Sequence, residues 1–402
     1  MYNILGDFMY RDTYLEINLD KISKNVRNLI DKYNQYNYYF GVIKGNAYGH
    51  GYYIVNTLIE NGINYIAVSN LEEAINVRKL NKQIPILCLE PIDIKWINKC
   101  MEQNITITIS NLQYVKQLCD LKLKNLKVHI KIDSGMNRLG FNNNKDLIKA
   151  INLLKRYNFI LEGIYTHMAS LGISDPYRKI QLNNFDKIVK NVDLTQFKII
   201  HIDRSLTCMC NKKIKYANGV RFGISIYGYN QIPKLDNSFK GKLRNFKSIL
   251  RQKKYHIEKY NFDRNIELYP ALSLYSKIIE IKTVHNGEFI GYLGYEHTGK
   301  DIQVATVCIG YADGIDLNAH GGYVFINKQA CKIIGTVNMG MISIIVNKNV
   351  KIGDKVEIIG DNANIRNLSN HCKTTIYKTM TCISPLLPRV YIKNNKIINT
   401  NE

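Results

Sequence analysis

The sequence lacks the features of a membrane or secreted protein. No apolar run approaches the length of a membrane span, and the first residues hold no basic segment followed by an apolar one. The nine cysteines form no CxxC pair, and the close pair Cys208 and Cys210 has no zinc-like partners nearby in sequence. We therefore expect free thiols, no metal site, no membrane contact and a cytoplasmic protein.

Acidic residues are also scarce. The chain has 33 Asp and Glu against 55 Lys and Arg, which gives a formal net charge of +22. An excess of this size is typical of nucleic-acid-binding proteins. Here, however, the basic residues accompany Asn, Ile and Tyr along the whole chain. We interpret the charge as a general compositional bias and expect no nucleic-acid partner.

What the sequence does contain is a regular alternation of apolar runs and amphipathic segments. The runs are apolar almost throughout, as expected for parallel strands that are buried on both faces. Eight such runs alternating with helical patterns favour a (β/α)₈ barrel of the TIM type over a doubly wound sheet. The predicted strands are 39–44, 65–70, 85–90, 105–110, 127–133, 162–168, 198–203 and 220–228.

The pattern changes after the eighth run. Residues 233–265 carry ten Lys and Arg against three acidic residues, which indicates a charged insertion or linker, with a partner-binding surface as the alternative. From residue 266 to 395, short alternating runs with glycine-containing turns predict a mainly-β domain. The barrel is expected over 13–232. Its early run "TYLEINL" can open the barrel or pair with the β domain, and residues 1–12 can join that domain too.

Lys44, in "VIKGNAYGHG", ends the first predicted strand, and catalytic residues of such barrels lie at this end of their strands. A lysine at a strand end is usually a solvated charge. In an apolar site it loses its proton readily and can form a Schiff base. Further polar residues end or follow later strands, namely Arg138, His167, Ser205 and Arg221. Their convergence on one rim favours the reactive amine.

Five segments together resemble one family. They are "VIKGNAYGHG", "KIDSGMNRLG", "GVRFGISIYG", "VCIGYADG" and "PRVY". Their order and spacing resemble those of the alanine racemases, pyridoxal 5′-phosphate enzymes with a barrel and a β domain. The resemblance covers residues 13–392 apart from the insertion. It implies interconversion of L- and D-alanine, supply of D-alanine to peptidoglycan, and a homodimer with composite active sites.

The resemblance also implies how the cofactor is held. Lys44 would carry it as a Schiff base, with His167 beside the ring. Arg221 would face the pyridine nitrogen, oriented by His201. An arginine has no acceptor and stays charged, so that nitrogen would remain unprotonated and the ring would be a weaker electron sink. The residues expected at the phosphate are Tyr48, Ser205, Gly223 and Ile224.

Racemisation needs an acid or base on each face of Cα. The resemblance implies Lys44 for one face and a tyrosine from the other subunit for the second. The turn "GEFIGYLGYEHTGKD" offers Tyr292 and Tyr295. We choose Tyr292 because it precedes Tyr311 of "GYADG" by 19 residues, the spacing expected in the family. A tyrosine needs a nearby cation to act as a base near neutral pH, and Arg138 is the candidate.

The resemblance extends to the substrate pocket. Arg138 and the backbone of Met339 would contact the substrate carboxylate, and Tyr311 would line the entrance. Lys131 matches a position that is often carbamylated in the family, where it would orient Arg138.

Three departures from the family pattern concern the surroundings of this pocket. Gly340 stands where an aspartate is usual, and Arg204 replaces an asparagine before Ser205. Pro385 and Leu386 replace a tyrosine and an arginine. The missing tyrosine leaves room for serine or a larger amino acid, although alanine is the expected substrate.

Two other functions remain as alternatives. A related barrel decarboxylase would carry a cysteine-containing substrate motif in its C-terminal domain, and none is found. A non-catalytic carrier of the same cofactor would not need Tyr292 and "GYADG".

Overall fold

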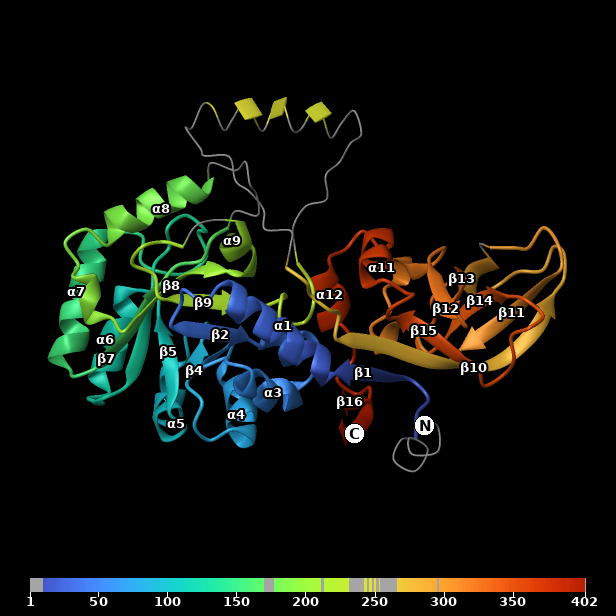
Figure 1. Cartoon of the computed structure of the whole chain (residues 1–402), viewed down its shortest axis with the longest axis horizontal. Coiled ribbons are helices and arrows are strands. Elements are labelled where there is room, and N and C mark those ends of the chain that lie inside the picture. Colours follow the sequence, from blue (N-terminus) through green and yellow to red (C-terminus); the bar gives the residue numbers. More distant parts are fainter. Residues whose placement is uncertain are drawn as a thin grey trace. The chain divides into compact units, whose positions relative to one another are not determined.

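The computed structural model describes residues 10–169, 177–210, 213–230, 242–243, 246–247, 249–250, 253, 266–294 and 296–401. The chain divides into two compact units, whose elements are labelled in Figure 1. We call Ser23–Lys44 with Val55–Leu268 the barrel unit. Met1–Ile22, Gly45–Ile54 and Tyr269–Glu402 form the β unit. This division differs from the boundaries drawn on the sequence, because residues 13–22 and 45–54 group with the β unit.

The barrel unit contains a closed barrel of eight parallel strands, as the sequence predicted. The last strand pairs with the first, so no edge is left open. In order the strands are β2 (Tyr38–Val42), β3 (Tyr65–Val68), β4 (Ile86–Cys88), β5 (Ile105–Ile109), β6 (Lys127–Lys131), β7 (Ile160–Tyr165), β8 (Ile199–Arg204) and β9 (Gly219–Phe222). Each overlaps one of the predicted runs.

Helices surround this barrel (Figure 1). Several begin at an asparagine whose side-chain oxygen accepts a hydrogen bond from a backbone N–H of the first turn: Asn70, Asn111 and Asn143. Such caps satisfy donors that a helix leaves unpaired at its start. The helices are α1 (Leu19–Lys32), which begins in the β unit, α3 (Val55–Glu60), α4 (Leu71–Leu80), α5 (Ile97–Glu102), α6 (Leu112–Asp120), α7 (Asn144–Arg156), α8 (Tyr177–Ile188) and α9 (Ser205–Cys210).

Aromatic and histidine rings fill the inside of the barrel. His201 is stacked between Phe40 and Tyr165, with ring centroids 4.5 Å away on each side. The His129 ring lies edge-on to His201, with centroids 5.1 Å apart. These side chains are buried. Polar rings in so tightly packed a core need hydrogen-bond partners, which the site supplies.

The β unit is built on a nine-stranded sheet in the order β11-β14-β13-β12-β15-β10-β1-β16-β17. The run "TYLEINL" contributes β1 (Tyr14–Asn18), which lies between β10 (Leu272–Val284) and β16 (Arg389–Lys393). It therefore pairs with the β domain and does not open the barrel. The other strands are β11 (Ile302–Val307), β12 (Tyr323–Ile326), β13 (Gln329–Ile334), β14 (Ile342–Val346), β15 (Lys355–Ile359) and β17 (Lys396–Asn401).

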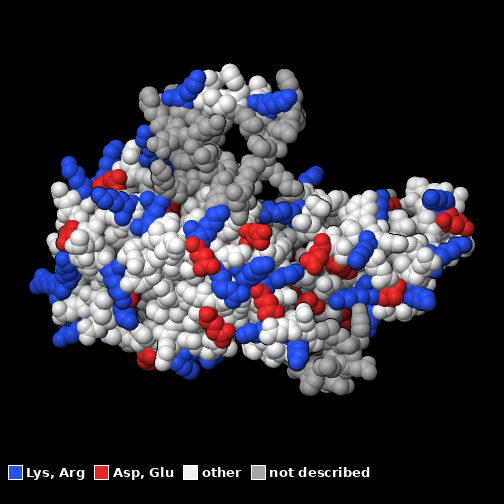
Figure 2. All heavy atoms as spheres, viewed as in Figure 1, with Lys and Arg blue, Asp and Glu red and all other residues white. Residues whose placement is uncertain are grey.

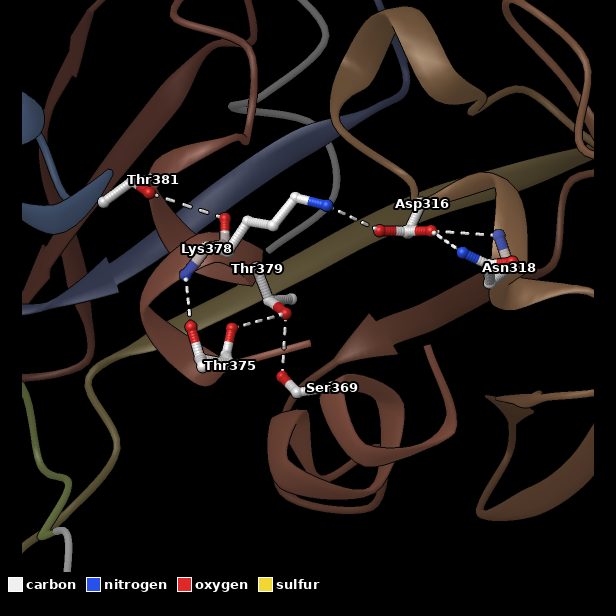
Figure 3. A network of polar contacts seen from close by, with 7 residues as sticks. All are labelled: Asp316, Asn318, Ser369, Thr375, Lys378, Thr379 and Thr381. Carbon is white, nitrogen blue, oxygen red and sulfur yellow. Dashed lines mark hydrogen bonds and ion pairs between the residues drawn. The ribbon is translucent and has the colours of Figure 1, made fainter. Parts of the chain in front are cut away.

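The β unit also holds two short helices that the alternating pattern did not predict, α11 (Ile365–His371) and α12 (Ile376–Thr381). A polar network fixes them (Figure 3). Lys378 Nζ lies 3.1 Å from Asp316 Oδ2, and the Asp316 carboxylate accepts a hydrogen bond from Asn318 N at 3.0 Å. The hydroxyls of Ser369 and Thr379 are 2.7 Å apart and join α11 to α12.

Residues Gly45–Tyr48 form a left-handed turn, with φ values of 62°, 52°, 52° and 53°. Non-glycine residues rarely adopt this conformation, because Cβ crowds the following carbonyl oxygen. Hydrogen bonds within the loop hold it, from Gly49 N to Gly45 O at 3.0 Å and from Gly51 N to Asn46 O at 2.9 Å. The strain sits directly after Lys44 in the chain.

Strand β16 clamps this turn from a distant part of the sequence. Arg389 Nε donates to Gly49 O at 3.0 Å, and the Tyr391 hydroxyl donates to His50 O at 3.0 Å. Helix α12 also packs against the turn, since the rings of Tyr48 and Tyr377 have centroids 5.8 Å apart. Two of the motifs found in the sequence, "AYGHG" and "PRVY", therefore meet in the fold.

The surface drawn in Figure 2 carries basic and acidic side chains interspersed. Within the part of the chain that is described, no disulfide joins the cysteines, and no cluster of three or more His, Cys, Asp or Glu is arranged to hold a metal. None of the helices described is long and apolar enough to cross a membrane. Most of the insertion 233–265, and residues 1–9, lie outside the described residues.

We expect Gly49→Ala to lower the free energy of unfolding by about 3 kcal/mol, as left-handed strain and a backbone clash add. Gly49 has φ +83°, and a Cβ there would collide with the carbonyl oxygen of Met380. Gly287→Ala is the matched control, because its φ is +85° with open space around it. That variant should lose only about 1 kcal/mol. Urea unfolding measures both, and equal losses would contradict the clash.

Candidate active site

The structure brings five of the predicted site residues to one end of the barrel. Lys44 follows β2. Arg138 and His167 follow β6 and β7, Ser205 follows β8, and Arg221 lies in β9. Because the strands are parallel and the barrel is closed, these positions share the C-terminal rim, where barrel enzymes carry their active sites.

Lys44 keeps an exposed surface at this rim although protein atoms crowd it closely. Desolvation lowers the pKa of its amine, and the positive charge of Arg138 lowers it further, while Glu73 and Glu90 oppose the shift. Both main effects favour the neutral amine, the form that attacks a carbonyl carbon. The local electrostatics therefore suit a lysine that forms a Schiff base.

Arg221 is buried, and both of its Nη atoms are hydrogen-bonded. Its Nη1 lies 2.6 Å from His201 Nδ1 and donates to His201 O at 2.8 Å. Its Nη2 donates to Thr166 O at 2.8 Å and to Ile202 O at 3.0 Å. Burial lowers the pKa of Arg221 to about 10, so the guanidinium remains charged at neutral pH. The arginine is held in one orientation from two sides.

His167 and Lys131 lie in the same electropositive environment. Burial, followed by the charge of Arg221, lowers the pKa of both side chains well below their usual range. The Lys131 amine also lies over the Tyr165 ring, 4.7 Å from its centroid. The imidazole of His167 is therefore neutral near pH 7, and both shifts reduce the positive charge close to Arg221.

The loop after β9 and the start of α9 offer donors to an anion. Ser205 Oγ accepts a hydrogen bond from Gly223 N at 3.0 Å and another from the Ser225 hydroxyl at 2.8 Å. Ile224 is buried beside them. Ser225 was not singled out in the sequence, although it stands in "GVRFGISIYG". Backbone N–H groups and hydroxyls at this place in a barrel suit a phosphate group.

The predicted residues of the β unit form a second group around residues 336–339. Tyr292 N donates to Thr336 Oγ1 at 3.1 Å, and Tyr311 N donates to Asn338 O at 2.9 Å. The side chains of Tyr292, Tyr311 and Met339 are 71%, 44% and 63% exposed. The structure thus gathers these three, whereas Tyr295 lies outside the described residues. Tyr48 also belongs to the β unit, in the turn clamped by β16.

The residues that depart from the family pattern differ in their surroundings. Nothing lies within 4 Å of where a Cβ on Gly340 would stand, and Leu386 is 83% exposed. The carbonyl oxygen of Pro385 accepts from Arg389 Nη1 at 3.2 Å. The Arg204 side chain packs against the segment that follows β7, where its Nε donates a hydrogen bond to Met168 O at 3.3 Å.

Comparison with known proteins gives the same two-part organisation. The model of the alanine racemase N-terminal domain matches residues 17–231, and that of the alanine racemase C-terminal domain matches residues 271–391. The fold and the named relatives are those of an isomerase that acts on amino acids. The chain belongs to the alanine racemase family.

Individual relatives agree along nearly the whole chain. It is 30% identical over 389 residues to the alanine racemase of Streptococcus suis (strain 98HAH33), covering 95% of this chain and 98% of the relative. The structure of alanine racemase from Bacillus anthracis with bound L-Ala-P matches with a TM-score of 0.84 at 31% identity, covering 98% of both chains. The structure of histidine racemase from Leuconostoc mesenteroides subsp. sake matches with a TM-score of 0.80 at 25% sequence identity. The match covers 96% of this chain and 99% of that one.

We expect Arg138→Leu to raise the pKa of Lys44, because a positive charge that disfavours the ammonium form is removed. Competitive acetylation across a pH series, read by mass spectrometry of the Lys44 peptide, measures this value in the protein without added cofactor. Arg27→Leu removes an exposed arginine that pairs with Asn61 and should leave the pKa of Lys44 unchanged. An unchanged or lower pKa in Arg138→Leu would show that the two charges do not interact.

Proposed function

We propose that this protein interconverts L- and D-alanine with pyridoxal 5′-phosphate, using one proton-transfer group on each face of Cα. The observation that carries the proposal is the buried Arg221. It stays positively charged at the rim where Lys44 is primed to react. A cation facing the ring nitrogen suits a reaction that only removes and returns one proton.

The residues present fit this cofactor. Lys44 offers an amine with a lowered pKa for the aldehyde carbon, and the charged guanidinium of Arg221 would face the ring nitrogen. Ser205, with the backbone of Gly223 and Ile224, would hold the phosphate, together with the hydroxyl of Tyr48. His167, kept neutral, would lie beside the ring. When bound, the cofactor supplies the electron sink that makes the Cα proton acidic.

The protein's own groups would then move the proton. Lys44, released when the substrate amine replaces it, takes or returns the Cα proton on one face. The Tyr292 hydroxyl serves the other face, supplied by the partner subunit of a homodimer. Arg138 and the Met339 backbone hold the substrate carboxylate so that the Cα–H bond points at these groups, and Tyr311 lines the entrance. The exposed positions of the three β-unit residues are consistent with a composite site.

A racemase of another amino acid is the second candidate. The open space at Gly340 favours it, and so does the similarity to a protein named histidine racemase. Pro385, where the family usually has tyrosine, would leave the pocket wider. Alanine remains first, because the relative that covers 95% of the chain is named alanine racemase. Supply of D-alanine to peptidoglycan, a cytoplasmic location and the carbamylation of Lys131 stay predictions.

A chiral assay of the purified protein with cofactor tests the substrate. We expect the highest kcat/KM with alanine in both directions, at least tenfold above serine and histidine. Lys44→Ala should lose both turnover and the visible absorption band of the covalently held cofactor. A kcat/KM that is higher with serine or histidine than with alanine would show that the protein is a racemase of another amino acid. The absence of any visible band in the wild-type protein would refute the cofactor assignment.

We expect Tyr292→Phe to abolish proton transfer on one face only. Conversion of either enantiomer should fall by at least a hundredfold, the usual scale for losing a general acid or base. Exchange of the Cα proton of one enantiomer with D₂O solvent, followed by NMR, should persist through Lys44. Tyr323→Phe is the matched control, since Tyr323 is another exposed tyrosine of the β unit, 55% exposed. Wild-type racemisation by Tyr292→Phe would exclude this role.

A further inference from the structure

A chain of buried polar groups extends from Arg221 through the inside of the barrel. Arg221 Nη1 lies 2.6 Å from His201 Nδ1. His201 Nε2 lies 2.9 Å from His129 Nδ1. His129 Nε2 lies 3.4 Å from Glu162 Oε2, the longest link of the three. The sequence pointed to Arg221 and His201, whereas His129 and Glu162 were not recognised as functional.

The chemistry of the first group fixes the direction of the whole chain. A guanidinium has donors and no acceptor, so His201 Nδ1 must accept from Arg221. In a neutral imidazole the other nitrogen then carries the proton, and His201 Nε2–H donates to His129 Nδ1. By the same argument His129 Nε2 carries a hydrogen, and it faces Glu162 Oε2 at 3.4 Å in a charge contact that lacks hydrogen-bond geometry. Every hydrogen therefore points away from Arg221 and toward the carboxylate.

The charge states agree with this direction. Burial lowers the pKa of both His129 and His201, so both imidazoles stay neutral. Glu162 is also desolvated, which raises its pKa, but the contacts with His129, Tyr65 and Thr106 prevail and lower it to about 2. An ionised carboxylate has only acceptors. It is therefore a suitable end for a chain of donors.

Glu162 Oε2 collects donors from several directions. The Tyr65 hydroxyl lies 2.7 Å away and the Thr106 hydroxyl 3.1 Å away. The Glu162 side chain is 11% exposed, and it lines an open groove together with residues at the start of β6 and β7. Oε2 of Glu162 thus faces the inside of the barrel. The rest of the carboxylate keeps contact with solvent at the end of the barrel opposite to the active-site rim.

The rings have no freedom to rearrange. His201 is stacked between Phe40 and Tyr165. His129 occupies space that a side chain on Gly163 would need, since a Cβ there would lie 2.5 Å from the His129 ring. Packing fixes the planes of the two rings, and the hydrogen bonds fix which nitrogen carries the proton.

We infer that His129 and Glu162 are positioning residues that hold His201 as the acceptor for Arg221 and so hold the arginine toward the cofactor ring. If His201 adopted the other tautomer, its Nδ1–H would face a guanidinium N–H, and two donors would repel. Glu162 opposes this through its negative charge, which lies 3.4 Å from His129 Nε2 and favours hydrogen on that nitrogen. The role for the cofactor rests on the proposed function, whereas the tautomers of the two histidines do not.

The test uses the full-length protein labelled with ¹⁵N in histidine. Ring-nitrogen NMR signals distinguish a bare nitrogen, an N–H and a protonated ring. The His129 and His201 signals are assigned by comparison with His129→Gln and His201→Gln. In the wild type without added cofactor we expect both rings to be neutral, with hydrogen on Nε2. Hydrogen on Nδ1 of either ring, or a protonated ring, at neutral pH would overturn the inference.

Two substitutions of Glu162 distinguish the loss of its side-chain oxygen from other effects of changing the residue. Glu162→Leu removes the acceptor and should produce a mixture of tautomers at His129 and His201. It should also weaken binding of pyridoxal 5′-phosphate by about tenfold, the scale of losing an outer partner at other buried sites. Glu162→Gln keeps an amide oxygen in place and should retain the wild-type tautomers and affinity. Unchanged histidine signals in Glu162→Leu, or the same loss in both variants, would overturn the inference.

A matched control and a fold check complete the experiment. Glu102→Leu removes an exposed glutamate whose carboxylate lies 2.9 Å from Lys99 Nζ, and it should change neither signal. Thermal unfolding shows whether each variant folds. If Glu162→Leu does not, the wild-type tautomers and Glu162→Gln still decide the matter. Failure to bind the cofactor or to racemise any amino acid would refute the proposed function, while the histidine signals would still report on the positioning residues.

Discussion

The buried guanidinium of Arg221 is the constraint on which the barrel interior depends. A cation inside a protein needs acceptors on every side, and this one takes them from the carbonyl oxygens of His201, Ile202 and Thr166. The register between β8 and β9 shifts between His201 and Arg204, so the ladder is irregular where these carbonyls turn to the arginine. Irregular pairing of this kind commonly marks a functional site in a sheet. A single pair of strands could not supply all of these acceptors. In the closed barrel, carbonyl oxygens on and beside β7 and β8 surround the guanidinium of Arg221, which lies in β9.

A second constraint acts on the segment after Lys44. The left-handed turn Gly45–Tyr48 costs free energy, and it persists because the surroundings determine it. Arg389 and Tyr391 bind its far end, while α12 packs against it and is itself fixed by the network around Lys378 and Asp316.

The sequence predicted the local features and missed those that depend on distant contacts. Eight apolar runs were sufficient to predict the barrel, and their positions after predicted strands were sufficient to place Lys44 and Arg138 at its rim. The partnership of Arg389 with Gly49 joins residues 340 positions apart, and no local pattern indicates it. Glu162 and His129 were hidden for a similar reason, since each stands in an ordinary strand and gains meaning only when the barrel closes. The pairing of "TYLEINL" also remained open, because a short alternating run fits an edge of either unit.

The distance between the positive and negative ends of the Arg221 chain has a chemical consequence. A carboxylate placed directly at a pyridine nitrogen would stabilise a proton there and strengthen the electron sink. Here Glu162 is separated from Arg221 by two neutral imidazoles. Glu162 acts on Arg221 only through these two imidazoles, whereas the carboxylate whose charge favours the charged form of Arg221 is Asp203. A carboxylate held at this distance would leave the ring nitrogen of a bound cofactor without an acidic partner, which suits the proposed exchange of one hydrogen at Cα.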